Sequence, residues 1–282
     1  MTLPVFVSET IHHEAIDWAT RASANGGIIS TNTIRAVSAF CRAIDTAQIR
    51  SAMYRVNPFC GGNLSGCLVP LYRGPTFGGT TFGNATDTNV NFVSADFIET
   101  GATGGLKFNG TNKYLQLGFA SNSLPSSTSV HGSYSATGLA TSGTRAVSGS
   151  GDGGSGNFVF YDHVSFLGAG RSFRHGSVTT GTFPNLTTPG TAESHIIGTR
   201  TAANAAALYR DGSLVASNAT SISTASTALG MFVGNYNLNG TPVGGQYTAA
   251  NLRMYSIGTG LTATQAAAFS AAVIAFNAAL GR

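Results

Sequence analysis

The chain has few charged side chains. Only 9% of its 282 residues are Asp, Glu, Lys or Arg, whereas about 25% is usual for a globular domain. Gly, Ser, Thr, Ala and Asn take their place, which argues against disorder driven by charge. A polar and nearly uncharged surface suits packing against other protein copies or recognition of sugars. An ordinary β-rich protein with small loops explains the composition equally well.

The chain also lacks a block of charge of one sign. Its 15 basic and 11 acidic residues leave a net charge of +4. Several arginines lie in the first part of the chain and alternate with acids, namely Arg21, Arg35, Arg42, Arg50, Arg55 and Arg73. Nucleic-acid binding requires a concentrated basic stripe, usually with aromatic partners. We therefore expect no nucleic-acid partner.

Cysteine is scarce as well. The three residues Cys41, Cys60 and Cys67 are an odd number, so they do not form a disulfide framework. Cys60 and Cys67 could close a small loop, but their spacing does not require it. Cys41 lies on a predicted helix face and is interpreted as a small buried apolar residue. No histidines cluster beside the three, which argues against a zinc site.

Long apolar runs are missing. The first residues have no basic region followed by an apolar segment, so we expect no signal peptide. No run approaches the length of a membrane span, so we expect synthesis in a cytoplasm and no membrane partner.

The first part of the chain has helical periodicity up to about residue 57. Apolar residues recur at spacings of three and four in three successive groups: Ile11, Ala15, Trp18, Ala22; then Ile34, Val37, Cys41, Ile44; then Ile49, Met53, Val56. This spacing places each group on one helix face, and Pro58 ends the third predicted helix. We expect residues 1–67 to be a helical docking region that packs on the rest of the chain or on a neighbouring subunit.

From about residue 68 the pattern becomes β-like. Short apolar or alternating runs are separated by small polar residues, at 90–97, 114–119, 130–136, 158–161, 165–168, 172–175, 194–198, 206–210, 214–217, 229–233 and 252–257. Many short strands at such spacing predict a sandwich or barrel. Asp211-Gly212 predicts a type I′ hairpin turn. Residues 140–156 are rich in Gly and Ser, and we expect them to include a flexible surface loop.

The last 25 residues predict an amphipathic helix over the β body. Thr262 and Gln265 have the spacing of a capping box, and Gly281 suits the position just past the helix end. The apolar stripe consists of Phe269, Val273, Phe276 and Leu280.

The order of these features resembles a concanavalin A-like (laminin-G-like) jelly roll. The segments that carry the resemblance are FVSADFIETGATGGLKFNGTNKYLQLGF, ALYRDGSLVAS, NLNGTP and LRMYSIGTGLTATQAAAFSAAVIAF. The fold expected is mainly β: a jelly-roll β-sandwich over residues 68–257, with the helical N-terminal region before it and a helix in 258–282 packed on it.

More narrowly, the chain resembles jelly-roll proteins of tailed bacteriophages and prophages. That resemblance implies a non-enzymatic virion structural protein on a tail, a fibre or a capsid. It also implies other virion proteins as partners, a homo-oligomer, and location in the virion after synthesis in the bacterial host. A lectin-like module for host glycans is the alternative, and a glycoside hydrolase is a third.

Hydrolase chemistry has little support in the acidic residues. Retaining hydrolysis needs two carboxylates about 5–5.5 Å apart, which on one strand means acids two positions apart. No two acids have that spacing, and the nearest pair in the β region is Asp96 and Glu99. Four histidines in strand-like contexts specify no triad with a nucleophile: His131, His163, His175 and His195. We expect no catalytic residues and no enzyme activity.

Two further motifs match known patterns in letters only. His12-His13-Glu14 precedes Asp17, which would share a helix face with His13, but the HExxH pattern of metalloproteases is not met. A solvated helix face explains these residues better than a metal site. The glycine pattern at residues 149, 151 and 154 precedes a strand rather than a helix, so it predicts no nucleotide site.

The loop over residues 234–246 is the candidate glycan-binding site. Its Asn235, Asn237, Asn239 and Gln246 copy the spacing of a calcium loop with amides in place of acids, which predicts poor calcium affinity. Tyr236 offers a ring for stacking, and Asn237 and Asn239 offer hydrogen bonds to a sugar. The alternative is a tight Asn/Gly turn. Asp87, Asp152 and Asp162 could supply a rim calcium, but no pattern supports it, so no cofactor or metal is expected.

Overall fold

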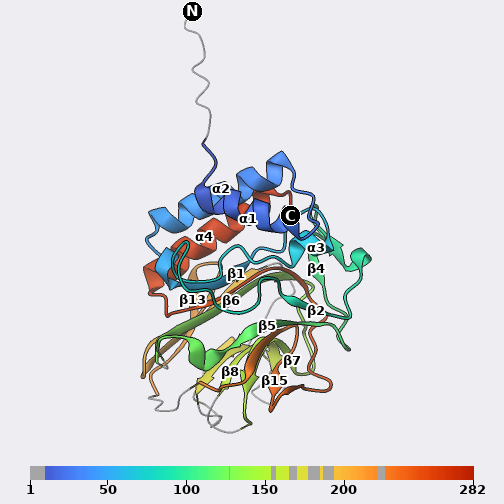
Figure 1. The fold of residues 1–282 in the computed structure, drawn as a ribbon. Helices are drawn as coiled ribbons and strands as arrows, with labels where there is room; N and C mark the ends of the chain where they lie inside the picture. Colours follow the sequence, from blue (N-terminus) through green and yellow to red (C-terminus); the bar gives the residue numbers. More distant parts are fainter. Residues whose placement is uncertain are drawn as a thin grey trace, which may run out of the picture.

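The computed structural model describes residues 10–126, 128–153, 157–164, 170–176, 185–186, 194–220 and 226–282. Two β-sheets are stacked face to face, and helices cover the outer face of one of them (Figure 1). Among these residues, none of the helices has the length and apolar character to cross a bilayer.

The helices lie at the two ends of the chain. They are α1 (His13–Ala24), α2 (Thr31–Thr46), α3 (Leu64–Cys67) and α4 (Ala263–Ala279), with short 3₁₀ turns at Arg50–Ala52, Ser94–Asp96 and Ser121–Ser123. The side chain of Ser30 accepts a hydrogen bond from the backbone N–H of Thr33 at the start of α2, as an N-cap residue should. Thr262 and Gln265 form the predicted capping box of α4.

The first sheet, called sheet A, faces the helices. Its strands run in the order β13 (Ser213–Asn218), β12 (Ala205–Arg210), β11 (Ser194–Ala202), β6 (Val130–Thr137), β17 (Asn251–Gly258), β4 (Gly105–Lys107), β3 (Phe97–Ile98), and β1 (Met53–Asn57) also pairs with β17. The described strands of this sheet all pair antiparallel. Asp211 and Gly212 have φ angles of 50° and 85° at the β12–β13 turn, which confirms the predicted hairpin.

The second sheet, called sheet B, lies on the far side from the helices. Its order is β10 (Asn185–Leu186), β9 (Gly170–Gly176), β8 (Asn157–Val164), β7 (Arg145–Gly151), β14 (Gly230–Val233), β5 (Tyr114–Ala120), β2 (Thr88–Val90), and β15 (Asn237–Leu238) and β16 (Thr241–Pro242) form a small hairpin beside β7. The fold is therefore mainly β, with two antiparallel sheets and a few helices, as predicted at that level.

The core between the sheets is aromatic. Tyr134 of sheet A meets Phe160 of sheet B edge to face, with ring centroids 5.2 Å apart, an arrangement that aromatic pairs favour. Glycine makes room where the sheets approach most closely, because a Cβ on Gly198 would lie 2.2 Å from the ring of Phe173. A single side chain added there would separate the layers.

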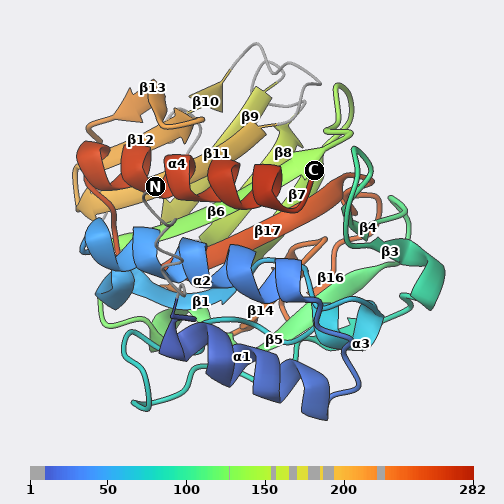
Figure 2. The ribbon, with the colours of Figure 1, turned by 90° about the horizontal axis from the view of Figure 1, so that it is seen from above.

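A second apolar layer joins sheet A to the helices. Trp18 of α1, Phe40 of α2 and Phe276 of α4 are buried in one cluster with Met254 of sheet A. Figure 2 shows α4 and α2 side by side across the sheet, with α1 next to α2. The apolar faces of the N-terminal helices are therefore buried against this chain itself.

Three sequence predictions were wrong in detail. Residues 53–57 form β1 rather than a third helix, because Gln48 turns to φ 55° after α2 and the next residues pair with β17. Part of the expected loop at 140–156 is β7 in sheet B. Residues 90–97 divide between β2, a turn and β3. The strand expected at 165–168 lies outside the described residues.

Candidate functional site

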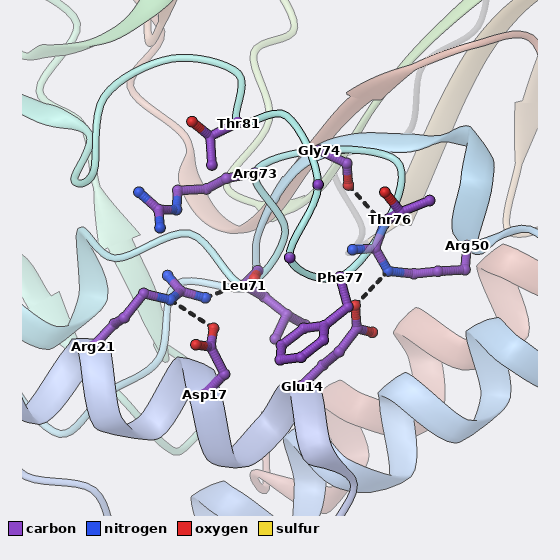
Figure 3. Close-up of a pocket in the computed structure, with 12 residues that line it drawn as sticks. Glu14, Asp17, Arg21, Arg50, Leu71, Arg73, Gly74, Thr76, Phe77 and Thr81 are labelled. Carbon is purple, nitrogen blue, oxygen red and sulfur yellow. Dashed lines mark hydrogen bonds and ion pairs between the residues drawn. The ribbon is translucent and has the colours of Figure 1, made fainter.

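A cleft lies between α1 and the segment that follows β1. It has a volume of about 240 Å³ and lies against a second hollow of about 420 Å³, and the two share Glu14, Arg50, Thr76 and Phe77. The larger hollow falls within the range of about 300–1,000 Å³ that is typical of ligand pockets. We call the two together the α1 cleft, and Figure 3 shows the first part.

One face of α1 forms a wall of the cleft. Glu14, Asp17 and Arg21 are three and four residues apart, so they lie along one side of the helix. Asp17 accepts a hydrogen bond from Nε of Arg21 at 2.8 Å. Glu14 is buried, and its Oε1 accepts from Nε of Arg50 at 2.8 Å. Both acids are therefore held by arginines.

The same arginines attach the wall to the opposite segment. Arg21 donates to the carbonyl oxygens of Pro70 and Leu71, at 2.8 and 3.0 Å. Arg50 donates to the carbonyl oxygen of Gly74 at 2.7 Å, and its guanidinium lies 3.9 Å from the ring centroid of Tyr72. These contacts hold the base of the cleft in one geometry.

Arg73 is the cation of the cleft without an acid partner. Among the described residues its side chain makes no hydrogen bond and no ion pair. Burial lowers its pKa from the ordinary value, and the nearby Arg21 guanidinium lowers it further. In Figure 3 the guanidinium groups of Arg73 and Arg21 point toward one another. The Asp17 carboxylate offsets the charge of Arg73 only in part, because it is already paired with Arg21.

Phe77 supplies an open aromatic surface. Its side chain is 55% exposed, and its ring meets the ring of His13 edge to face at 4.7 Å. It lies in a run of exposed Gly and Thr residues at 76–81. Among the described residues, the other phenylalanines are buried or half-buried, so Phe77 gives the cleft an aromatic surface that is open to a ligand.

Glu14 brings an unused acceptor to the same place. Its Oε2 is buried and has no hydrogen-bond partner, although Oε1 is paired with Arg50. A buried carboxylate oxygen without a donor is costly. A bound hydroxyl group would supply that donor.

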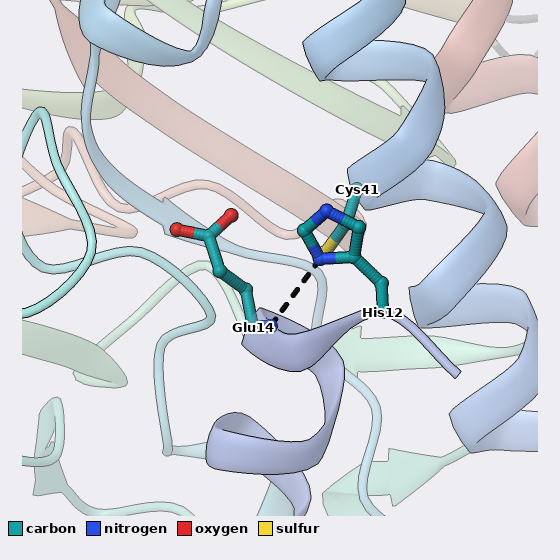
Figure 4. Close-up of side chains that lie close together, drawn as sticks. All are labelled: His12, Glu14 and Cys41. Carbon is teal, nitrogen blue, oxygen red and sulfur yellow. Dashed lines mark hydrogen bonds between the residues drawn. The ribbon is translucent and has the colours of Figure 1, made fainter. Parts of the chain in front are cut away.

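His12, Glu14 and Cys41 form a compact cluster beside the cleft (Figure 4). Their ligand atoms lie within 4.8 Å of one another. However, Nε2 of His12 contacts Asp45 at 2.9 Å, and Nδ1 accepts from the backbone N–H of Glu14. Burial also raises the pKa of the Cys41 thiol to about 12, which keeps it protonated. Both ring nitrogens of His12 are therefore engaged within the chain.

The predicted glycan-binding loop is placed differently from what sequence reasoning assumed. Tyr236 is buried with Ala146, Val159 and Tyr161 on the outer face of sheet B, so its ring is not an open platform. Asn237 is also buried and donates to the carbonyl oxygen of Gly230 at 2.7 Å. Of the three candidates, Asn239 alone is exposed, and its φ of 51° fits the alternative of a tight turn.

The other acidic candidates have structural partners. Asp87 is fully buried and pairs with Arg55 at 2.6 Å, and Tyr255 also donates to it at 2.8 Å. Asp96 pairs with Lys113 at 2.5 Å, whereas Glu99 accepts from the backbone N–H groups of residues 61 and 62. Asp96 and Glu99 therefore do not share a site, and Asp87 has no oxygen left for calcium. The side chain of Asp162 lies outside the described residues.

The histidines belong to the packing of sheet A and α4. His195 contacts Ser133 and Ser270 through its two ring nitrogens, at 3.1 and 3.0 Å. His131 contacts Ser256 at 3.0 Å. Burial lowers the pKa of His131 to about 4 and that of His195 to about 3, so both are neutral at physiological pH. His175 is also buried, and the side chain of His163 lies outside the described residues.

Sequence reasoning missed the α1 cleft. It considered the α1 face only as a possible metal site, and it treated Arg73 as one of several scattered cations. The signal that could have been used is Phe77, a large apolar residue in a run of Gly and Thr where no strand is predicted. Which residues meet it depends on how the chain folds back on α1.

Comparisons with known proteins give only distant likenesses. No family model matches the chain, and no curated protein matches it. Domain 4 of the extracellular arabinanase AbnA from Geobacillus stearothermophilus, solved with arabinotriose, is similar at 14% identity and a TM-score of 0.49, over 78% of this chain and 98% of that domain. A mutant Trypanosoma rangeli sialidase is similar at 12% identity and a TM-score of 0.47, over 83% of this chain. This chain spans 38% of that sialidase.

The prediction of a bacteriophage virion structural protein was wrong. The solved structures that resemble this chain include a domain of an arabinanase and a sialidase. The virion partners were inferred from that role and have no support here, whereas the location stays a prediction. These distant likenesses assign no site and no activity to this chain. Its function is therefore inferred from the geometry of the α1 cleft.

Proposed function

We propose that this protein is a non-catalytic carbohydrate-binding module with a concanavalin A-like jelly-roll topology, and that its ligand lies in the α1 cleft. The observation that carries the proposal is the exposed ring of Phe77 at a cleft whose side chains have hydrogen-bonding capacity left. Ligand sites combine an apolar surface with a few placed polar groups in this way.

A sugar matches both kinds of surface. Its C–H face packs on an aromatic ring, and its hydroxyl groups both donate and accept hydrogen bonds. Thr76 and Thr81 line the cleft with hydroxyls, which can act as donors or acceptors. The unused Oε2 of Glu14 can only accept while the acid is ionised. A neutral apolar ligand would leave these groups without partners, which is unfavourable.

The acids of the cleft support binding rather than hydrolysis. Glycoside hydrolysis needs one carboxyl group that delivers a proton and a second that acts as nucleophile or base. Asp17 and Glu14 are each engaged by an arginine, at 2.8 Å. Their role in the cleft is to position Arg21 and Arg50.

The test is a binding screen combined with a substitution of Phe77. Isothermal titration and affinity electrophoresis against a panel of neutral and acidic polysaccharides should identify a ligand for the unmodified protein. Phe77→Ala should then weaken binding by about tenfold, which corresponds to about 1.4 kcal/mol, because it removes the stacking surface. The thermal midpoint should change little, since the side chain is exposed.

Val93→Ala is the matched control, because Val93 is 59% exposed and does not line the α1 cleft. It should bind as the unmodified protein does. Failure to bind any carbohydrate, or binding that is equal in the Phe77 and Val93 variants, would contradict the proposal. Release of reducing sugar that is lost in Glu14→Gln would show that the module is catalytic.

A further inference from the structure

We propose that the ligand of the α1 cleft carries a carboxylate, as a uronic-acid-type sugar does, and that Arg73 is the residue that binds it. This inference depends on the proposed function and specifies its ligand class. It starts from the charge of the first hollow, which three arginines and two acids line; Asp45 lines the second hollow and contacts His12. Two of the arginines are paired with the two acids of the first hollow, so one positive charge is left.

That charge belongs to Arg73. Its guanidinium has no hydrogen-bond or ion-pair partner among the described residues, and it faces Arg21 across the cleft (Figure 3). Two neighbouring guanidinium groups repel one another unless an anion lies between them. Arg21 uses its Nε and one N–H of each terminal nitrogen on Asp17, Pro70 and Leu71, so it still has donors for a ligand. A guanidinium has five donors.

The chemistry favours a carboxylate over a phosphate group. Arginine binds carboxylates through two parallel hydrogen bonds. A single negative charge matches the single positive charge that the cleft leaves. A doubly charged phosphate would exceed it and would lie close to Glu14 and Asp17, which repel it. Neutral sugars would leave Arg73 without an ion-pair partner of its own, beside the guanidinium of Arg21.

The other side chains of the cleft suit the ring and the hydroxyl groups of such a sugar. Phe77 offers a surface for the ring, and Glu14 offers an acceptor for a ring hydroxyl. The sugar would thus be oriented with its carboxylate toward Arg73 and a hydroxyl toward Glu14. A ligand with both an acid and hydroxyl donors uses all of these features, whereas a simple anion uses only Arg73.

The experiment compares charged and neutral forms of one polymer. Binding would be measured by titration with polygalacturonate, alginate and hyaluronan, with the methyl ester of each polymer that binds, and with dextran sulfate. The variants are Arg73→Gln, Arg73→Lys and Arg35→Gln. Arg35 is an exposed arginine of α2 that does not line the cleft, so its substitution is a control for the same change in charge.

We expect at least one uronate polymer to bind, and its methyl ester to bind about tenfold more weakly or worse. Arg73→Gln should reduce uronate binding by a similar factor and leave binding of the ester unchanged. Arg73→Lys should recover part of the affinity, because it restores charge but not the two-pronged hydrogen bond. Arg35→Gln should have no effect, and no variant should change the thermal midpoint.

Other outcomes would overturn the inference separately from the proposed function. If neutral polymers bind through Phe77 and Arg73→Gln has no effect, the protein is a carbohydrate-binding module whose ligand needs no carboxylate. Tighter, Arg73-dependent binding of dextran sulfate than of any uronate would show that the anion is a sulfate ester. Absence of binding to every polymer would overturn both.

Discussion

Two arginines of this protein, Arg55 and Arg73, have opposite surroundings. Arg55 is completely buried, but Asp87, Tyr255 and backbone carbonyl oxygens surround it. Arg73 is half-buried and has no such partner among the described residues. The first arrangement stabilises the fold by joining β1 to residues 82–87, whereas the second leaves a charge for a ligand. Whether an arginine stabilises the fold or is available to a ligand is therefore determined by its contacts and not by its residue type.

The buried pair predicts a large effect on stability. Asp87→Ala should lower the free energy of unfolding by about 3–5 kcal/mol, because it leaves Arg55 as a buried charge without an acid. Urea unfolding followed by circular dichroism would measure it. Asp45→Ala is the comparison, since its pair with His12 is partly exposed and should contribute at most about 1 kcal/mol. Similar losses in the two variants would contradict this account.

The three cysteines predict a chemical result. All are buried and free, and burial raises the pKa of each thiol, that of Cys41 to about 12. Only a thiolate reacts readily, so the native protein should show no thiol that reacts with Ellman's reagent at about pH 8. The denatured protein should show all three. One rapidly reacting thiol in the native state would be inconsistent with this burial.

At the scale of elements, α4 is the clearest case in which local sequence specifies local structure. Its capping box and its buried stripe of apolar residues were predicted and are confirmed. Gly281 follows the helix with φ 67°. β7 is the opposite case: its residues are mostly small and polar, and no local pattern indicates a strand. It is a strand because β8 and β14 pair with it on either side.

The cap of α4 can be tested directly. Thr262→Ala removes the side-chain oxygen that accepts from the backbone N–H of Gln265, so the free energy of unfolding should fall by about 1 kcal/mol. Thr264→Ala, an exposed position in the first turn, should have no such cost because alanine favours helix. Thermal unfolding of the two variants compares them. Equal stability would show that the cap contributes nothing measurable.

For the molecule as a whole, buried histidines make stability depend on pH. Burial lowers the pKa of His131 to about 4, and that of His175 and His195 to about 3, from an ordinary value of 6.5. The unfolded chain therefore takes up protons before the folded chain does. Stability from these groups is complete above about pH 6.5 and falls as the pH decreases toward the folded values. The expected slope is about 1.4 kcal/mol per pH unit per histidine.

Urea unfolding between about pH 7 and pH 4 measures that slope. His175→Gln should reduce the histidine contribution by about a third, because one of three such groups is removed. His13→Asn is the control, since His13 is exposed, and it should leave the slope unchanged. A free energy of unfolding that does not vary over this range would contradict the burial of neutral histidines.

Periodicity, capping residues and the Asp-Gly turn were enough to predict a mainly β protein with helices at both ends, because these signals act over a few neighbouring residues. The same signals could not reveal β1, since its residues suit a helix face until pairing with β17 is known. They also could not show that Tyr236 is buried while Phe77 is exposed. Burial depends on which distant segment covers a side chain.

The α1 cleft was decided by tertiary structure alone. Arg21 contacts carbonyl groups that lie 49 and 50 positions along the chain, and this contact brings the α1 face to Arg73 and Phe77. No spacing in the sequence predicts this contact, because it forms only when α1 and the segment after β1 are both packed beside sheet A. Local free energies select the elements, and the packing of those elements creates a site with one charge that is only partly offset.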